Sequence, residues 1–169
     1  MIGNYKNHML RINGIVNDSI VDGEGIRLTI FTQGCPHHCP KCHNPQTHDF
    51  KGGYYIDIKE IIMMMKENPL LDGITLSGGE PMEQADTCAI LAEEAKKIGL
   101  NVWVYTGYCW EELQKDFYKK LLSFTDVLVD GAFIEELRSL ELRFRGSSNQ
   151  RMIDVQKSFQ QNCIVLKNI

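Results

Sequence analysis

Three cysteines within eight residues are the part of the sequence best suited to chemistry. Cys35, Cys39 and Cys42 stand at C-x3-C-x2-C spacing in the segment GCPHHCPKCHN. Thiolates this close together, in a loop rich in glycine and proline, can converge on one metal centre. The spacing differs from the C-x2-C-x2-C run of bacterial ferredoxins, and no fourth cysteine lies nearby. A 4Fe–4S cube held by three thiolates leaves one iron open, and an open coordination position is typical of reactive metal centres.

Zinc is the alternative occupant of the same segment. Together with His37, His38 or His43, the three thiolates could complete a closed Cys3His tetrahedron. The spacing favours an iron–sulfur centre but leaves both open. The other cysteines stand singly among apolar residues, where free cysteine is usually a buried, inert core residue, and we expect this of Cys88, Cys109 and Cys163.

A series of strand–turn–helix units is expected to position the cysteines. The alternating run Arg27–Thr32 predicts a strand that leads directly into them. Further strands, spaced as in βαβ crossovers, are predicted at Gly73–Leu76, Asn101–Tyr105, Thr125–Val129 and, at the end of the chain, Cys163–Leu166. Helical periodicity predicts helices over Ile56–Glu67, about Gln84–Ile98 and about Trp110–Leu122. We therefore predict one α/β domain over residues 1–169, an open, partial β/α barrel with a largely parallel sheet.

Each predicted inner strand is followed by a turn that contains glycine. These turns are Ser77-Gly78-Gly79-Glu80-Pro81, Thr106-Gly107 and Asp130-Gly131. In parallel α/β architectures, the loops after the carboxyl ends of the strands converge on the ligand. The sequence therefore predicts a ligand site at this edge of the sheet, beside the cysteines.

Five blocks of sequence, in the same order, resemble the radical S-adenosylmethionine activating enzymes of glycyl-radical proteins. The first runs from Gly23–Arg27 through the cysteines to Asn44. The others are TLSGGEP, WVYTGYCWEEL, DVLVDGAF and RFRGSSNQRMIDV. Within that group the chain is similar to the activases of anaerobic (class III) ribonucleoside-triphosphate reductases. The resemblance covers nearly the whole chain, and it implies a partial barrel of the radical S-adenosylmethionine type.

The resemblance implies an oxidoreductase with two cofactors, a 4Fe–4S cluster on Cys35, Cys39 and Cys42 and S-adenosyl-L-methionine chelating the open iron. One electron from the cluster would cleave the sulfonium to methionine and a 5′-deoxyadenosyl radical. That radical would take a hydrogen atom from a glycine of the reductase, its protein partner. The resemblance also implies a flavodoxin-type electron donor. The cofactor supplies the difficult chemistry, and the protein supplies its position.

The turns after the strands are candidates for binding S-adenosylmethionine. Gly78 and Gly79 would let backbone approach its methionine end closely, and Glu80 could pair with its ammonium. Thr106 could donate a hydrogen bond to the cofactor, and Asp130 could bind a ribose hydroxyl or a small cation. Either residue could instead serve only as a cap.

Two residues beside Cys42 are candidates for lying against the adenine. Many relatives in the wider superfamily have an aromatic residue just before the third cysteine, where this chain has Lys41, so His43 is the possible substitute. Arg27 is a candidate for holding the cysteine loop, or else an exposed residue at a strand end. No role is expected for the remaining histidines, which are His8, His37, His38 and His48.

Composition limits the other functions. The net charge of −4 argues against a nucleic-acid protein, which would show a basic stripe. The sequence has no apolar run long enough to span a membrane and no apolar stretch near Met1 typical of a secretion signal, so we expect a cytoplasmic protein. The alternatives left open are activation of another glycyl-radical enzyme such as pyruvate formate-lyase, a ferredoxin-like carrier, and a zinc-binding module.

Overall fold

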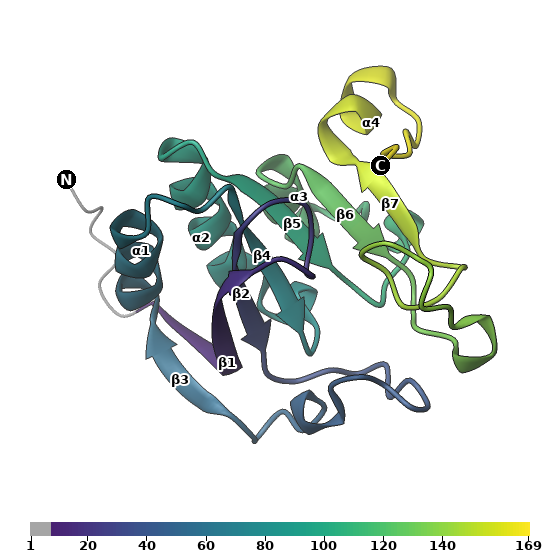
Figure 1. Cartoon of the computed structure of the whole chain (residues 1–169), viewed down its shortest axis with the longest axis horizontal. Helices are drawn as coiled ribbons and strands as arrows, with labels where there is room; N and C mark the ends of the chain where they lie inside the picture. Colours follow the sequence, from purple (N-terminus) through teal and green to yellow (C-terminus); the bar gives the residue numbers. More distant parts are fainter. Residues whose placement is uncertain (1–7) are drawn as a thin grey trace.

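One seven-stranded sheet forms the frame of the computed structural model, which describes residues 8–169 (Figure 1). The strand order is β3-β1-β2-β4-β5-β6-β7. The strands are β1 (Met9–Ser19), β2 (Arg27–Thr32), β3 (Tyr54–Asp57), β4 (Gly73–Gly78), β5 (Asn101–Tyr105), β6 (Val127–Asp130) and β7 (Arg151–Asp154). The helices are α1 (Ile58–Glu67), α2 (Ala85–Lys97), α3 (Asp116–Ser123) and α4 (Val155–Gln161).

The centre of the sheet is parallel and its margins are antiparallel. Strands β2, β4, β5 and β6 run in the same direction, as the strand–turn–helix pattern predicts. Strand β1 is antiparallel to both β2 and β3, and β7 is antiparallel to β6. In Figure 1 the arrowheads of the four parallel strands point toward the lower right, where the cysteine loop and residues 131–150 gather. The mixed α/β class and the parallel centre are thus confirmed.

The two faces of the sheet differ in what covers them. On one face, side chains such as Leu76, Val104 and Leu128 face the helices and are completely buried in the main core. On the other face, Trp103 and Val129 form a smaller cluster with partly buried aromatic residues. Alternation along each strand separates the faces, since successive side chains point to opposite sides. The helix-free face is therefore available to carry a site.

Several elements differ in type or in bounds from those predicted. The helix expected from Trp110 is a 3-10 turn over Trp110–Leu113, and α3 begins only at Asp116. The expected final strand is an isolated bridge between Leu166 and Ile153. Strand β7 and helix α4 occupy the region before it, and the Asp154 side chain caps α4 by accepting a hydrogen bond from the Lys157 backbone. None of the helices in residues 8–169 is long and apolar enough to cross a bilayer.

Arg27 is buried and not exposed, and its side-chain hydrogen bonds lie at the amino end of β2, whereas the cysteine loop follows the other end. It opens β2 at the amino edge of the sheet, and its side chain is fully buried. The guanidinium donates to Thr75 Oγ1 at 2.6 Å and to the Ile74 and Glu24 carbonyls at 2.6 and 2.7 Å, and it lies 5.5 Å from the Trp103 ring centroid. Burial lowers the pKa of Arg27 to about 10, which keeps it charged at neutral pH. Arg27 therefore fixes the start of β2 against β4 and β5.

The scattered cysteines divide into one buried and two exposed residues, and all six cysteines are free thiols. Cys88 lies inside α2 and is completely buried, as expected. The expectation of burial is wrong for Cys109 and Cys163. Cys109 precedes a surface 3-10 turn, and Cys163 follows the end of α4, positions that turn these side chains toward solvent.

Alkylation should separate these thiols. In the native protein at mildly alkaline pH, iodoacetamide is expected to label Cys163 and, more slowly, Cys109, but not Cys88. Burial raises the pKa of Cys88 to about 12, so the reactive thiolate is scarce, and it also excludes the reagent. Desolvation raises the pKa of Cys109 to a smaller extent. Peptide mass spectrometry checks the pattern, with the protein unfolded in guanidinium as the control in which Cys88 becomes labelled; native labelling of Cys88 would contradict the burial.

Candidate functional site

The cysteine loop leaves the carboxyl end of β2 and is anchored to the segment that follows it. The Gly34 backbone N–H donates to the Thr47 carbonyl at 2.8 Å, and that of Cys35 donates to the His48 carbonyl at 3.2 Å. Gly34 has a φ of 100°, and a Cβ there would overlap the Phe50 ring. Only glycine satisfies both conditions without strain. The first cysteine is therefore held at a defined place beside the sheet.

The three cysteines line a single cavity of about 110 Å³. Its other walls come from the carboxyl ends of the parallel strands, namely Gly78 and Gly79 at the end of β4, Thr106 and Gly107 after β5, and Gly131 after β6. The structure therefore brings together the cysteines and most of the turn residues that the sequence singles out. This convergence follows from the parallel strands, whose carboxyl ends share one edge.

The two adjacent glycines allow the turn after β4 to touch the cysteine loop. A Cβ on Gly79 would lie 2.5 Å from the Gly34 carbonyl oxygen, and one on Gly78 would overlap the backbone of Phe31. The Glu80 backbone N–H donates to the Gly34 carbonyl at 2.9 Å. Backbone thus packs directly on backbone, and one wall of the cavity carries no side chain.

Glu80 is completely buried, and four donors from this protein surround its carboxylate. One oxygen accepts from Thr106 Oγ1 at 2.8 Å and from the Met82 backbone at 3.0 Å. The other accepts from the Gly107 backbone at 2.8 Å and lies 2.7 Å from His37 Nε2. The hydrogen bond to Glu80 is the main cause that raises the pKa of His37 above its usual value. His37, which the sequence offered only as a possible zinc ligand, thus contacts the buried glutamate behind the cavity wall.

The donor set of the cavity suits a thiolate-held metal centre. Desolvation raises the pKa of Cys35 to about 11, and a backbone hydrogen bond from His37 partly offsets this effect. The Asn44 backbone N–H donates to Cys42 Sγ at 3.4 Å, the kind of contact that tunes cluster sulfurs. The soft sulfur donors match zinc or an iron–sulfur cluster better than magnesium or calcium.

In the described part of the chain, the cysteine loop does not gather its ligand atoms into a compact set. Among residues 8–169, the three ligand-type atoms that all lie within 4.8 Å of one another belong to Cys109, Glu111 and Asp130, and not to the cysteine loop. A tetrahedral zinc site with Zn–S bonds of about 2.3 Å would hold its sulfurs only about 3.8 Å apart. A 4Fe–4S cube binds each thiolate through a different iron and spaces the sulfurs more widely. The three thiols therefore do not form a compact tetrahedral set in this structure.

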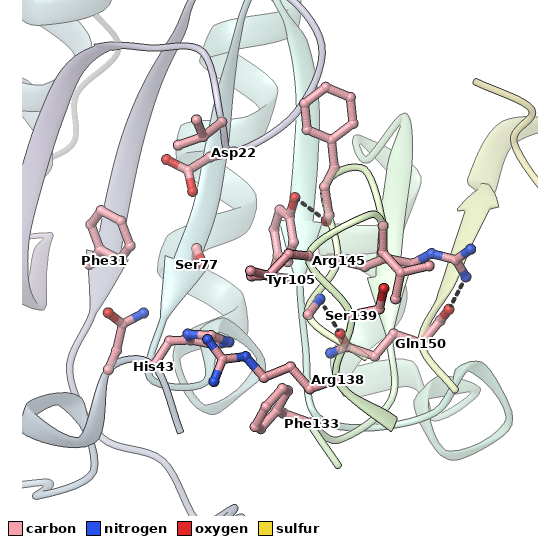
Figure 2. Close-up of a pocket in the computed structure, with 16 residues that line it drawn as sticks. Asp22, Phe31, His43, Ser77, Tyr105, Phe133, Arg138, Ser139, Arg145 and Gln150 are labelled. Carbon is pink, nitrogen blue, oxygen red and sulfur yellow. Dashed lines mark hydrogen bonds between the residues drawn. The ribbon is translucent and has the colours of Figure 1, made fainter. Parts of the chain in front are cut away.

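A second cavity of about 470 Å³ adjoins the first on the helix-free face of the sheet (Figure 2). Four residues line both cavities and form their shared wall: Ser77, Tyr105, Phe133 and Gln150. Tyr105 is fixed by a hydrogen bond of 2.6 Å from its hydroxyl to the Phe144 carbonyl. Arg145 donates to the Gln150 carbonyl at 2.6 Å, whereas its buried Nε has no partner among the described residues. The larger cavity is thus walled by aromatic side chains and carries polar groups.

Two residues that the sequence proposed as cofactor contacts, Lys41 and Asp130, lie outside both cavities. Lys41 is exposed and pairs with Glu135 at 3.7 Å, whereas His43 lines the larger cavity and packs edge-on against Phe133. Asp130 is almost completely buried, but its carboxylate binds the Arg151 guanidinium, with Nε at 3.0 Å, and accepts from the Trp110 backbone at 2.7 Å. The expected cofactor contacts of Lys41 and Asp130 therefore have no support in the structure. Asp130, at the end of β6, instead forms a structural ion pair with Arg151, at the start of β7.

Comparison with known proteins identifies the family of this chain. Residues 21–153 match the family described as the 4Fe-4S single cluster domain. The chain is 38% identical to a protein of Vibrio cholerae and 36% identical to one of Haemophilus influenzae, each over 139 residues, 78% of this chain and 89% of the relative. A protein of Enterobacteria phage T4 is 30% identical over 139 residues, 78% of this chain and 86% of the relative. All three relatives are named anaerobic ribonucleoside-triphosphate reductase-activating protein. The chain belongs to this family of activating proteins, with a 4Fe-4S single cluster domain.

Proposed function

We propose that this protein uses a 4Fe–4S cluster and S-adenosylmethionine to generate a glycyl radical on an anaerobic ribonucleoside-triphosphate reductase. The observation that carries the proposal is the small cavity, in which three free thiols face a turn whose wall is backbone. Membership of the family of activating proteins supports the choice of partner.

The residues that line the two cavities have different roles in the proposed reaction. Cys35, Cys39 and Cys42 hold the cluster, and the backbone of Gly78 and Gly79 meets the methionine end of the cofactor. When bound, the cluster supplies one electron that breaks a C–S bond of S-adenosylmethionine, leaving methionine and a 5′-deoxyadenosyl radical. The aromatic residues of the shared wall exclude water from this reaction, and His43 borders the space for the nucleoside.

The fold supports an open, partial barrel of the radical S-adenosylmethionine type. The helices cover one face of the sheet, and both cavities lie on the other face at the carboxyl ends of the strands. The strands β3 and β7 form the two edges and do not pair with each other, which leaves the side open. We assign the protein to the cytoplasm and its electron supply to a flavodoxin-type donor, in keeping with the family resemblance.

The rim of the larger cavity supplies a place for the glycine-bearing segment of the reductase. Val21 and Leu140 line this cavity although their side chains are 71% and 88% exposed. Exposed apolar side chains that border a functional cavity are typical of a surface that is covered by a partner. The cavity lies on the open side of the sheet, so a segment of a large protein can reach it.

Replacement of Leu140 by aspartate should weaken activation of the reductase about tenfold, because contact with one apolar side chain contributes about 1.5–3 kcal/mol. The yield of glycyl radical at limiting reductase measures this loss. Cleavage of S-adenosylmethionine without the reductase should stay unchanged. Leu70→Asp is the matched control, since Leu70 is 67% exposed in the loop before β4, at the opposite edge of the sheet. An equal loss in both variants would contradict this docking site.

The experiment that tests the proposed function is anaerobic reconstitution with iron and sulfide, followed by dithionite and S-adenosylmethionine. We expect a brown protein that releases 5′-deoxyadenosine and gives a glycyl radical signal by electron paramagnetic resonance when the anaerobic reductase is present. A signal only with pyruvate formate-lyase would change the partner. A colourless protein that binds zinc and leaves S-adenosylmethionine intact would refute the proposal.

A further inference from the structure

Between the first two cysteines of the loop, His37 is the residue whose side chain forms a hydrogen bond with a strand-end turn. We propose that His37 is a positioning residue: through Glu80, it holds the cysteine loop at a fixed position relative to the turns after β4 and β5. The inference rests on the proposed function, because the position of the loop matters for the cofactor that would bind at the open side of the cluster. His37 itself contacts neither group in this assignment.

Three contacts fix the His37 ring. Its Nε2 lies 2.7 Å from Glu80 Oε2, and its ring meets that of Tyr108 edge-on with the centroids 4.5 Å apart. On a third side it packs against Gly107, where an added Cβ would overlap the imidazole. The side chain is only 15% exposed. Because Gly107 and Tyr108 follow β5, these contacts fix the cysteine loop relative to the end of β5.

The carboxylate of Glu80 is the hub of this arrangement. Its two oxygens have about four acceptor positions, and four donors occupy them, from Thr106, Met82, Gly107 and His37. A carboxylate filled in this way has no free position for the ammonium of S-adenosylmethionine. Glu80 therefore acts within the protein, and the methionine end of the cofactor is left to the backbone of the turn.

Removal of the imidazole would leave Glu80 buried and one donor short. A buried carboxylate that loses a hydrogen-bond partner is strongly disfavoured, so it would turn or draw in water. The loop would keep the backbone bonds at its two ends, from Cys35 to His48 and from Cys42 to Cys39. We therefore expect the three thiols to remain able to bind a cluster, while the open side of the cluster shifts relative to the turn.

His38 offers a matched control within the same loop. It is exposed, and its ring packs only edge-on against His48, with the centroids 5.5 Å apart. It stands between the same two cysteines as His37. Replacing His38 thus tests the general effect of losing a histidine from the loop.

The test compares anaerobically reconstituted wild-type protein with His37→Ala, His37→Gln and His38→Gln. Iron and sulfide per chain are measured first, and the reduced cluster is then titrated with S-adenosylmethionine by electron paramagnetic resonance. We expect full clusters in all four proteins. For His37→Ala the apparent Kd for S-adenosylmethionine should rise about tenfold, as for loss of one charge-assisted hydrogen bond, and the cofactor-dependent change of the spectrum should shrink. His37→Gln, whose amide can still donate to Glu80, should recover most of the affinity, and His38→Gln should match the wild type.

Each other outcome counts against the inference. A His37→Ala protein with the affinity and spectrum of the wild type would overturn it while leaving the proposed function intact. Loss of iron from both His37 variants would overturn it by identifying His37 as a metal ligand. A wild-type cluster whose spectrum ignores S-adenosylmethionine would refute the proposed function, and the inference with it.

Discussion

Replacement of Cys35, Cys39 or Cys42 by serine is expected to abolish both the cluster and the release of 5′-deoxyadenosine. Each thiol lines the same small cavity, and a cube that already has one iron without a protein ligand loses a corner with each replacement. Even the loss of an outer-shell partner costs about 10–100-fold in metal affinity, so loss of a direct ligand should leave no cluster. Iron and sulfide analysis, with the visible absorbance of the anaerobic protein, measures the result.

The scattered cysteines provide the controls. Cys88→Ala, Cys109→Ser and Cys163→Ser should each keep a full cluster, because these thiols do not line the small cavity. A ferredoxin-like carrier would need a fourth ligand, and one of the three control variants would then lose its iron. Retention of the cluster in all three, with its loss in each of the loop variants, separates the two functions.

The largest effect on stability is expected from Arg27→Met. The substitution keeps much of the side-chain volume but removes three hydrogen bonds that the charged guanidinium donates to Thr75 Oγ1 and to the Ile74 and Glu24 carbonyls. A hydrogen bond to a charged group contributes about 1.5–3 kcal/mol, so we expect the free energy of unfolding to fall by about 3 kcal/mol. For a protein of this size that corresponds to a decrease in Tm of about 6–12 °C.

Thermal unfolding of the apoprotein, followed by circular dichroism, measures this decrease. Arg138→Met is the control, because Arg138 is exposed at the rim of the larger cavity and an exposed substitution changes stability by about 0.5 kcal/mol or less. Equal midpoints for the two variants would show that the contacts of Arg27 contribute little.

The parallel centre of the sheet could be predicted because each of its strands carries its own local signal. The runs from Arg27, Gly73 and Asn101 are apolar and β-rich, and turns with glycine follow the strands. The outer strands lack such signals. In β1 the pairing with β2 shifts register twice, which interrupts the alternation, and β3 and β7 have only four residues each. These strands form because a neighbouring strand offers hydrogen bonds, and that information is not local.

The site shows the same limit. The cysteine triad and the glycine turns are contiguous in sequence, so their types and spacing predicted one site. The contact between His37 and Glu80 joins positions 43 residues apart, and no periodicity announces it. No role was expected for Tyr105, and none for Ser77 beyond its place in the turn, although each stands at a strand end on the face opposite the buried apolar residues. The signal that could have found them is this alternation, together with the turn that follows each strand.

The wall that the two cavities have in common also determines how far a short-lived species must diffuse between them. Ser77, Tyr105, Phe133 and Gln150 line both cavities, so the larger cavity is the nearest neighbouring space for a species released beside the cysteines. Side reactions with water, buffer or dissolved thiols compete poorly over so short a path.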